Sequence, residues 1–209
     1  MSNVVYINNP LLTHKISSIR GKEVPCATFR QYVKQIAVME TYEAMKDFKT
    51  VDREIETPIQ KTTKPFIEED KIVIVPILRA GIGMQEGVSA VLPGAKVHHI
   101  GMRRDEVTHL ASAYYCNLPA SLENDIVLLV DPMLATGGSA LDAIKLLKEH
   151  GAKDIRFLSI IAAPEGVKAV SEAYPDVKIY IGALDEKLNE NCYIIPGLGD
   201  AGDRIFGTL

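Results

Sequence analysis

The chain has 209 residues, a formal net charge of -4 and three widely spaced cysteines, Cys26, Cys116 and Cys192. This length fits a single domain spanning residues 1–209, and the absence of any basic block argues against a nucleic-acid or membrane-surface binder. The cysteines form no CxxC pair, the N-terminus lacks a leader pattern, and no apolar run approaches the ~20 residues of a membrane span, so we expect a cytoplasmic protein.

Residues 1–60 are expected to form a mainly helical arm. Pro10 stands at the start of one segment with helical spacing, and Gly21 closes it. Thr28 and Gln31 have the spacing of a capping box, which predicts that a second helix begins near Thr28. The apolar stripe of this second helix indicates packing rather than chemistry.

Residues 70–182 alternate between short apolar runs and segments with helical spacing. The alternation predicts an α/β fold with a parallel sheet and helices on both faces, and ligands then bind beyond the carboxyl ends of the strands. The predicted strands are Ile72–Pro76, Val97–Gly101, Tyr114–Leu118, Ile126–Val130, Ile155–Ala162 and Val177–Ile181.

Arg79 follows the first of these strands and precedes a glycine-rich turn. Gly81, Gly83 and Gly87 give the spacing GxGxxxG, one residue longer than the dinucleotide fingerprint, and no strand with a terminal acid follows at the usual distance. We therefore disfavour a dehydrogenase. A guanidinium beside backbone N–H groups is instead well suited to a pyrophosphate.

The stretch DIVLLVDPMLATGGSA, residues 125–140, reads as a buried strand, an acid at its end, and a glycine turn into a helix. Free N–H groups at a helix start favour a phosphate, and the hydroxyls of Thr136 and Ser139 add donors. A plain strand-to-helix turn is the alternative, and the stretch is not a P-loop because no Lys follows the second glycine. Asp131 beside the cradle suggests a ligand with both hydroxyls and a phosphate, such as a ribose 5-phosphate.

The C-terminal segment NCYIIPGLGDAGDRIFGTL contains four glycines, which we expect to prevent regular structure. Its apolar residues argue against a disordered tail. An ordered loop whose bare backbone contacts a ligand fits both features.

Three motifs together resemble the uracil branch of the type I phosphoribosyltransferases. They are PILRAG, VDPMLATGGSA and YIIPGLGDAGDR. The arm phrases PLLTHKISSIR and FRQYVKQIAVMETYEAMKDF, and the run GMRRDEVT followed by YYCNLP, are similar to the same family. The resemblance implies a type I phosphoribosyltransferase-like sheet with an N-terminal helical arm, a flexible hood over the reaction centre, and a base-binding segment at residues 183–209.

The resemblance further implies transfer of the 5-phosphoribosyl group of phosphoribosyl pyrophosphate (PRPP) to N1 of uracil, giving UMP and pyrophosphate. A PRPP-sensing regulator without turnover is the alternative. The implied catalytic residues are Arg79, Arg104, Asp131 and Asp200. Ile194, Gly199, Asp200 and Ala201 are the implied uracil contacts. The implied PRPP contacts are Arg79, Arg104, Asp131, Pro132, Met133, Leu134, Ala135, Thr136, Gly137, Gly138, Ser139 and Asp200.

Mg²⁺ is the implied cofactor, with no direct protein ligand assigned and Asp200 a candidate contact through water. The implied assembly is a homodimer or homotetramer, and the sequence leaves open which of the two forms, as well as whether GTP activates the enzyme. Arg103 and residues 107–112 depart from the family pattern, which leaves the packing of the hood open.

Overall fold

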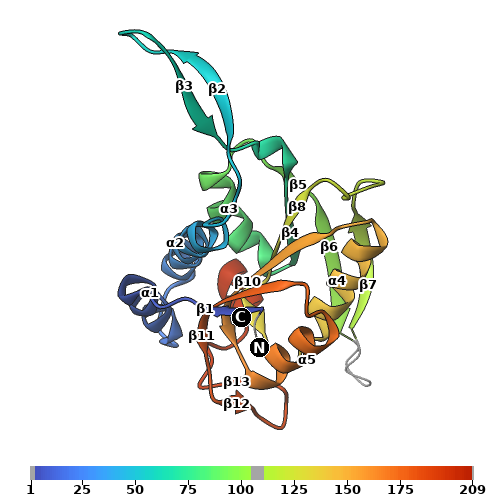
Figure 1. Cartoon of the computed structure of the whole chain (residues 1–209). Helices are drawn as coiled ribbons and strands as arrows, with labels where there is room; N and C mark the ends of the chain where they lie inside the picture. Colours follow the sequence, from blue (N-terminus) through green and yellow to red (C-terminus); the bar gives the residue numbers. More distant parts are fainter. Residues whose placement is uncertain (1–2, 105–110, 209) are drawn as a thin grey trace.

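The computed structural model describes residues 3–104 and 111–208, and its centre is one sheet in which most neighbouring strands are parallel (Figure 1). The strand order is β1-β11-β10-β8-β4-β6-β7. Strand β7 (Ala111–Asn117) lies antiparallel to β6 (His99–Arg104) at one edge. At the other edge β1 (Val4–Tyr6) pairs in parallel with β11 (Lys178–Leu184). The α/β architecture that we predicted is therefore confirmed.

The middle strands are β4 (Ile72–Leu78), β8 (Ile126–Val130) and β10 (Asp154–Ala162), and each follows the predicted bounds within two residues. The short β5 (Lys96–Val97) pairs with β4, and β9 (Met133–Leu134) pairs with β10. Almost every side chain of these middle strands is buried, as expected for a sheet covered on both faces.

Helices cover the two faces unequally. Residues Ile72 and Ile74 of β4 belong to a core cluster with α1 (Pro10–Arg20), α2 (Cys26–Ala44) and α3 (Gly81–Val91). The alternating residues Val73 and Val75 point into a second cluster. That cluster includes α4 (Gly138–Glu149) and α5 (Pro164–Ala173). Successive side chains of a strand point to opposite faces, so two separate cores form.

The N-terminal arm contains the two predicted helices, but one boundary was wrong. Helix α1 begins after Asn9, whose side chain accepts hydrogen bonds from the N–H groups of Leu11 and Leu12. Helix α2 begins at Cys26, two residues before Thr28, and Pro25 at its N-cap has no side-chain cap. The proline fixes the backbone entering the helix, so the capping box is not used.

A β-hairpin that we did not predict follows the helices. Among the strands that the structure describes, β2 (Val51–Glu56) and β3 (Lys61–Phe66) pair only with each other, and they stand away from the body of the molecule (Figure 1). Ile59 near its tip is 90% exposed. In the single chain both faces of the hairpin are exposed to solvent. Its sequence therefore lacks the alternation of apolar and polar residues that predicts a strand.

The C-terminal segment is ordered, as expected, but it is more regular than its glycines suggested. Strands β12 (Lys187–Leu188) and β13 (Ile194–Ile195) form a small antiparallel pair. Helix α6 (Ala201–Phe206) follows and includes Gly202, so the expectation that the glycines prevent regular structure was wrong here. Asp200 caps this helix by accepting a hydrogen bond from the Asp203 N–H at 2.9 Å. The short 3-10 turn Glu69–Lys71 completes the described elements.

Candidate active site

The carboxyl ends of β4 and β8 lie side by side because the two strands are parallel and Pro76 pairs with Val130. Arg79 and Asp131 follow these strands and so emerge at the same edge of the sheet. The chain is tightly packed here, since a Cβ atom at Gly81 would lie 2.5 Å from the Val130 carbonyl oxygen. Gly81 is therefore required for helix α3 to start against the end of β8.

The predicted phosphate cradle is the turn between β9 and α4. Gly137 has a φ of 88°, a left-handed conformation that favours glycine, and it stands at the N-cap of α4. The Thr136 hydroxyl accepts a weak hydrogen bond from the Gly138 N–H at 3.4 Å. The first turn of a helix leaves N–H groups without helical partners, so this turn presents donors and the positive end of the helix dipole to an anion.

A cavity of about 560 Å³ joins this cradle to the C-terminal segment, a size that suits a small-molecule ligand. Of the predicted site residues, eight line it: Asp131, Met133, Ala135, Ser139, Ile194, Gly199, Asp200 and Ala201. The remaining lining residues are Ala80, Asn191, Cys192, Tyr193 and Gly202. Residues 131–139 and 191–202, together with Ala80, thus form one concave surface although they are far apart in sequence.

Asp131 is the perturbed titratable group of the cavity. Burial raises the pKa of its carboxyl to about 7, the Met133 N–H opposes that rise, and the negative charge of Asp200 adds to it. The Met133 N–H lies 3.5 Å from Asp131 Oδ1, so this hydrogen bond is long. A carboxyl in this environment is ready to take a hydroxyl or a cation as partner.

Arg79 does not line the cavity but directly precedes the lining residue Ala80, and the neighbouring helix α6 holds its side chain. Its Nη2 atom donates to Asp203 Oδ1 at 3.0 Å, and its guanidinium lies 5.8 Å from the centre of the Phe206 ring. Asp203 also accepts a hydrogen bond from the Thr208 hydroxyl. These contacts lower the pKa of Asp203, the Thr208 hydrogen bond most and that from Arg79 next. The side chain of Arg79 remains 57% exposed, so it is available to an anion.

The other predicted residues lie in different places. Pro132 and Leu134 are buried and face β10, because the Pro132 carbonyl accepts from the Ile161 N–H and the Leu134 carbonyl from the Ala163 N–H. These two residues shape the turn without lining the cavity. Thr136, Gly137 and Gly138 lie between the lining residues Ala135 and Ser139. Arg104 ends β6 opposite Ala111. The predicted hood residues 105–110 lie outside the described residues.

Sequence reasoning missed Asn191, Cys192 and Tyr193, which line the cavity beside Ile194. Cys192 has a φ of 60°, so the backbone turns sharply immediately before the base-binding motif. Tyr193 opens the motif YIIPGLGDAGDR and the other two residues directly precede it, so this position was the signal available. None of the three belongs to a recognisable spacing pattern.

Asp131 and Asp200 are the acidic side chains that line the cavity, and their mutual repulsion suits a divalent cation brought in by an anionic ligand. Within residues 3–104 and 111–208, no group of three or more His, Cys, Asp or Glu side chains is close enough to hold a metal ion. No helix among these residues is long and apolar enough to cross a membrane.

Comparison with solved structures supports the class that this site suggests. The structure resembles a purine phosphoribosyltransferase from Pyrococcus horikoshii with a TM-score of 0.50 and 16% identity, covering 75% of this chain and 85% of that one, which is evidence for the fold alone. The structure of the AQ2163 protein from Aquifex aeolicus matches with a TM-score of 0.94 and 40% identity over 97% of each chain. The fold is that of the type I phosphoribosyltransferases.

Sequence comparison narrows this class to one family. Residues 6–208 match the family described as uracil phosphoribosyltransferase. The uracil phosphoribosyltransferase of Finegoldia magna is 55% identical over 208 residues, with each chain covered completely. The chain belongs to the uracil phosphoribosyltransferase family.

Proposed function

We propose that this protein transfers the 5-phosphoribosyl group of PRPP to N1 of uracil, giving UMP and pyrophosphate. The observation that carries the proposal is the single cavity in which the turn after Asp131 faces the segment Ile194–Gly202. A phosphate site and a base site must lie this close for a sugar to be joined to a base. The full-length relationship to uracil phosphoribosyltransferases supports the same reaction.

Residues Ala135–Ser139 bind the 5-phosphate in this proposal. The N–H groups at the start of α4 donate to its oxygens, and the hydroxyls of Thr136 and Ser139 add donors. Asp131 accepts hydrogen bonds from the ribose hydroxyls. Its raised pKa means that a hydroxyl or cation partner restores the charged form that burial disfavours.

Arg79 and Arg104 are the proposed partners of the pyrophosphate. Arg79 is held by Asp203 and Phe206 on α6, so its guanidinium is oriented before the substrate arrives. The bond between ribose C1 and the pyrophosphate oxygen breaks with its electron pair leaving on the pyrophosphate. Arginines beside that oxygen stabilise the charge as it develops.

Mg²⁺ is the proposed cofactor, and when bound with PRPP it neutralises part of the pyrophosphate charge. Asp131 and Asp200 are the residues that would hold it, with Asp200 acting through water. The same carboxylates favour positive charge at ribose C1 while the bond breaks. Uracil N1 then supplies the electron pair for the new C1–N1 bond, and its proton passes to the departing pyrophosphate or to solvent. No covalent intermediate with the protein is needed.

Uracil is the proposed base because a backbone loop can match its edge. Uracil presents O4 as an acceptor and N3–H as a donor, and cytosine reverses both, so fixed main-chain groups of Ile194 and Gly199–Ala201 would leave cytosine with buried unpaired atoms. Gly199 has a φ of 81°, which exposes backbone without a side chain in the way.

One assay tests the function. Protein, Mg²⁺ and PRPP are mixed with uracil, cytosine, adenine or hypoxanthine, and nucleotide and pyrophosphate are measured. We expect UMP with uracil alone. PRPP binding without UMP formation would favour a PRPP-sensing regulator instead. Asp131→Ala and Arg104→Ala should lose turnover while remaining folded, and full activity in either would contradict the role assigned to that residue.

The protein is further proposed to be a cytoplasmic homodimer or homotetramer. The exposed hairpin β2–β3 supports an assembly, and the three free cysteines support a cytoplasmic location. GTP is proposed as an effector, with no site assigned to it. Adding GTP to the uracil assay tests whether GTP is an effector. Light scattering measures the mass of the assembly and so tests the oligomeric state.

A further inference from the structure

Gly197, in the segment proposed to bind the base, is held on both sides of its backbone by one ion pair. Its N–H donates to Asp185 Oδ2 at 2.9 Å, and its carbonyl accepts from Arg20 Nη1 at 2.8 Å. Arg20 and Asp185 also bond to each other through two contacts of 2.6 and 2.8 Å. The three residues therefore form a closed unit that joins the end of helix α1, the end of β11 and the base segment.

A second arginine fastens the next residue of the segment to the same helix end. Arg204 Nη1 donates to the Leu198 carbonyl at 2.6 Å, and its Nη2 donates to the Gly21 carbonyl at 2.5 Å. The guanidinium lies 4.4 Å from the centre of the Phe29 ring in α2. Consecutive residues Gly197 and Leu198 are thus tied to consecutive residues Arg20 and Gly21.

None of these groups lines the cavity itself, whereas Ile194 and Gly199 on either side of Gly197 and Leu198 do. We propose that Arg20, Asp185 and Arg204 are positioning residues that fix the base-binding loop by clamping it to the C-terminal end of α1. This inference rests on the proposed function, in which main-chain groups of that loop bind uracil. Selection by backbone groups requires them to be held in place, because a loop without side-chain contacts can shift to suit another base.

The clamp is suited to this role because it is sheltered from water. The side chain of Asp185 is only 4% exposed, and that of Arg20 is 25% exposed. Two parallel contacts fix the relative orientation of a guanidinium and a carboxylate, which a lysine ammonium cannot do. Gly197 is also irreplaceable, since it has a φ of 65° and a Cβ there would lie 2.2 Å from the Ile194 carbonyl oxygen.

The test compares Asp185→Asn, Arg20→Lys and Arg204→Lys with the unaltered enzyme. Losing a charged hydrogen-bond partner of a loop typically weakens what the loop binds by roughly tenfold or more. We therefore expect KM for uracil to rise about tenfold in each variant while KM for PRPP stays unchanged. In the double variant Arg20→Lys with Asp185→Asn, KM for uracil should rise by less than the product of the two single increases, because both residues act through one unit.

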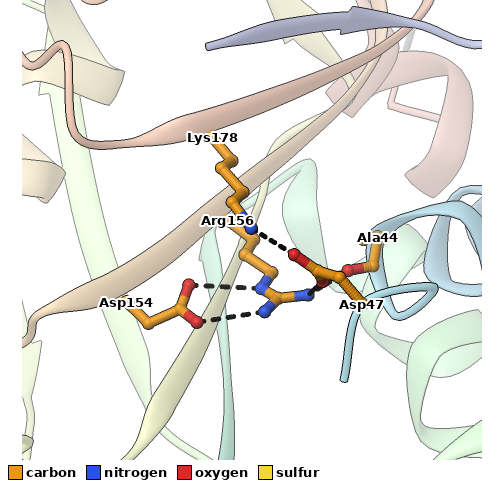
Figure 2. Close-up of polar contacts among 5 residues, drawn as sticks. All are labelled: Ala44, Asp47, Asp154, Arg156 and Lys178. Atoms are coloured by element: carbon orange, nitrogen blue, oxygen red, sulfur yellow. Dashed lines mark hydrogen bonds and ion pairs between the residues drawn. The ribbon is translucent and has the colours of Figure 1, made fainter. Parts of the chain in front are cut away.

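A matched control lies at the opposite end of the same sheet. Arg156 is 3% exposed and donates to both carboxylate oxygens of Asp154, at 3.0 and 3.2 Å, and Asp47, Lys178 and the Ala44 carbonyl complete that network (Figure 2). Asp154→Asn likewise removes the charge of a carboxylate that contacts an arginine at two points. It should lower stability as Asp185→Asn does and leave both KM values unchanged.

The outcomes separate this inference from the function on which it rests. Ala201→Val places extra atoms in the cavity wall and should raise KM for uracil. If it does so while Asp185→Asn and Arg20→Lys leave KM for uracil unchanged, or raise both KM values equally, the clamp is refuted and the base site stands. If Ala201→Val also has no effect on uracil, the proposed base site itself is wrong. Should Asp185→Asn fail to fold, Arg20→Lys decides, since it keeps the charge beside Asp185.

Discussion

Glu40 lies within α2 with none of its surface exposed, and within the described part of the chain neither carboxylate oxygen has a hydrogen-bond partner. A Cβ atom at Gly182 would lie 3.0 Å from Glu40 Oε1 and 2.7 Å from Ile16, so the surroundings are crowded and largely apolar. Burial raises the pKa of Glu40 well above its usual range. The folded protein therefore keeps a proton that the unfolded chain releases.

This difference has a defined sign. Above the pKa of the unfolded glutamate, the unfolded state binds fewer protons, so the free energy of unfolding falls by about 1.4 kcal/mol for each pH unit until the folded carboxyl also ionises. Glu40→Met is similar in volume and removes the unpaired polar group, which should add about 1–3 kcal/mol of stability. For a chain of this size each kcal/mol corresponds to about 2–4 °C in Tm.

Urea unfolding from about pH 5.5 to about pH 8 measures both effects. Glu40→Met should be more stable near neutral pH and should lose the part of the slope that Glu40 causes. Glu40→Gln is the control, because it removes the titratable group but keeps a buried polar one. It should reduce the dependence of the unfolding free energy on pH without giving the full increase in stability. A Glu40→Met variant less stable than the unaltered protein near neutral pH, with the slope retained, would refute the reasoning.

Three further predictions concern the site and the hairpin. Asp131 has a pKa of about 7 and acts as a carboxylate in the proposed reaction, so kcat/KM for PRPP should increase as pH rises through about 7. The residual activity of Asp131→Asn should lack this increase. If the variant keeps the same pH profile, Asp131 is not the group that causes it. Asp203→Asn should raise KM for PRPP only modestly, by about two- to fivefold, because its ion pair with Arg79 is partly exposed and solvent-screened pairs are weak. A selective rise in KM for uracil would instead contradict its role beside Arg79. Placing charges on the exposed hairpin with Ile59→Asp and Phe66→Asp should reduce the mass measured by light scattering, and an unchanged mass would show that the hairpin is not an interface.

Much of the fold could be predicted because burial leaves a periodic trace in sequence. Strands covered on both faces, such as Ile126–Val130, read as continuous apolar runs, and helices such as Pro164–Ala173 begin at a proline. The parallel order then places Arg79 and Asp131 together, since both follow strands whose carboxyl ends share one edge. Glycines beside hydroxyl residues likewise indicated the turn into α4, which is the predicted anion cradle.

Other features leave no recognisable trace in the local sequence, and several depend on partners that are distant along the chain. Strand Val4–Tyr6 is defined by its pairing with β11, and the hairpin by its pairing with itself. Helix α6 forms despite Gly202 because Asp200 caps it and Arg204 is held by two distant carbonyls.

The sequence by itself determined the class of fold, the edge of the sheet at which Arg79 and Asp131 emerge, and the glycine turn that leads into α4, because each follows from local periodicity or from a turn. Only the tertiary structure decided that Arg20 meets Asp185 across 165 residues and that Glu40 has no hydrogen-bond partner among residues 3–104 and 111–208. A charged residue is written the same way in the sequence whether its side chain lies in water, in an ion pair or alone in the core. Their energies depend on what surrounds them in space, and that is set by the packing of the whole chain.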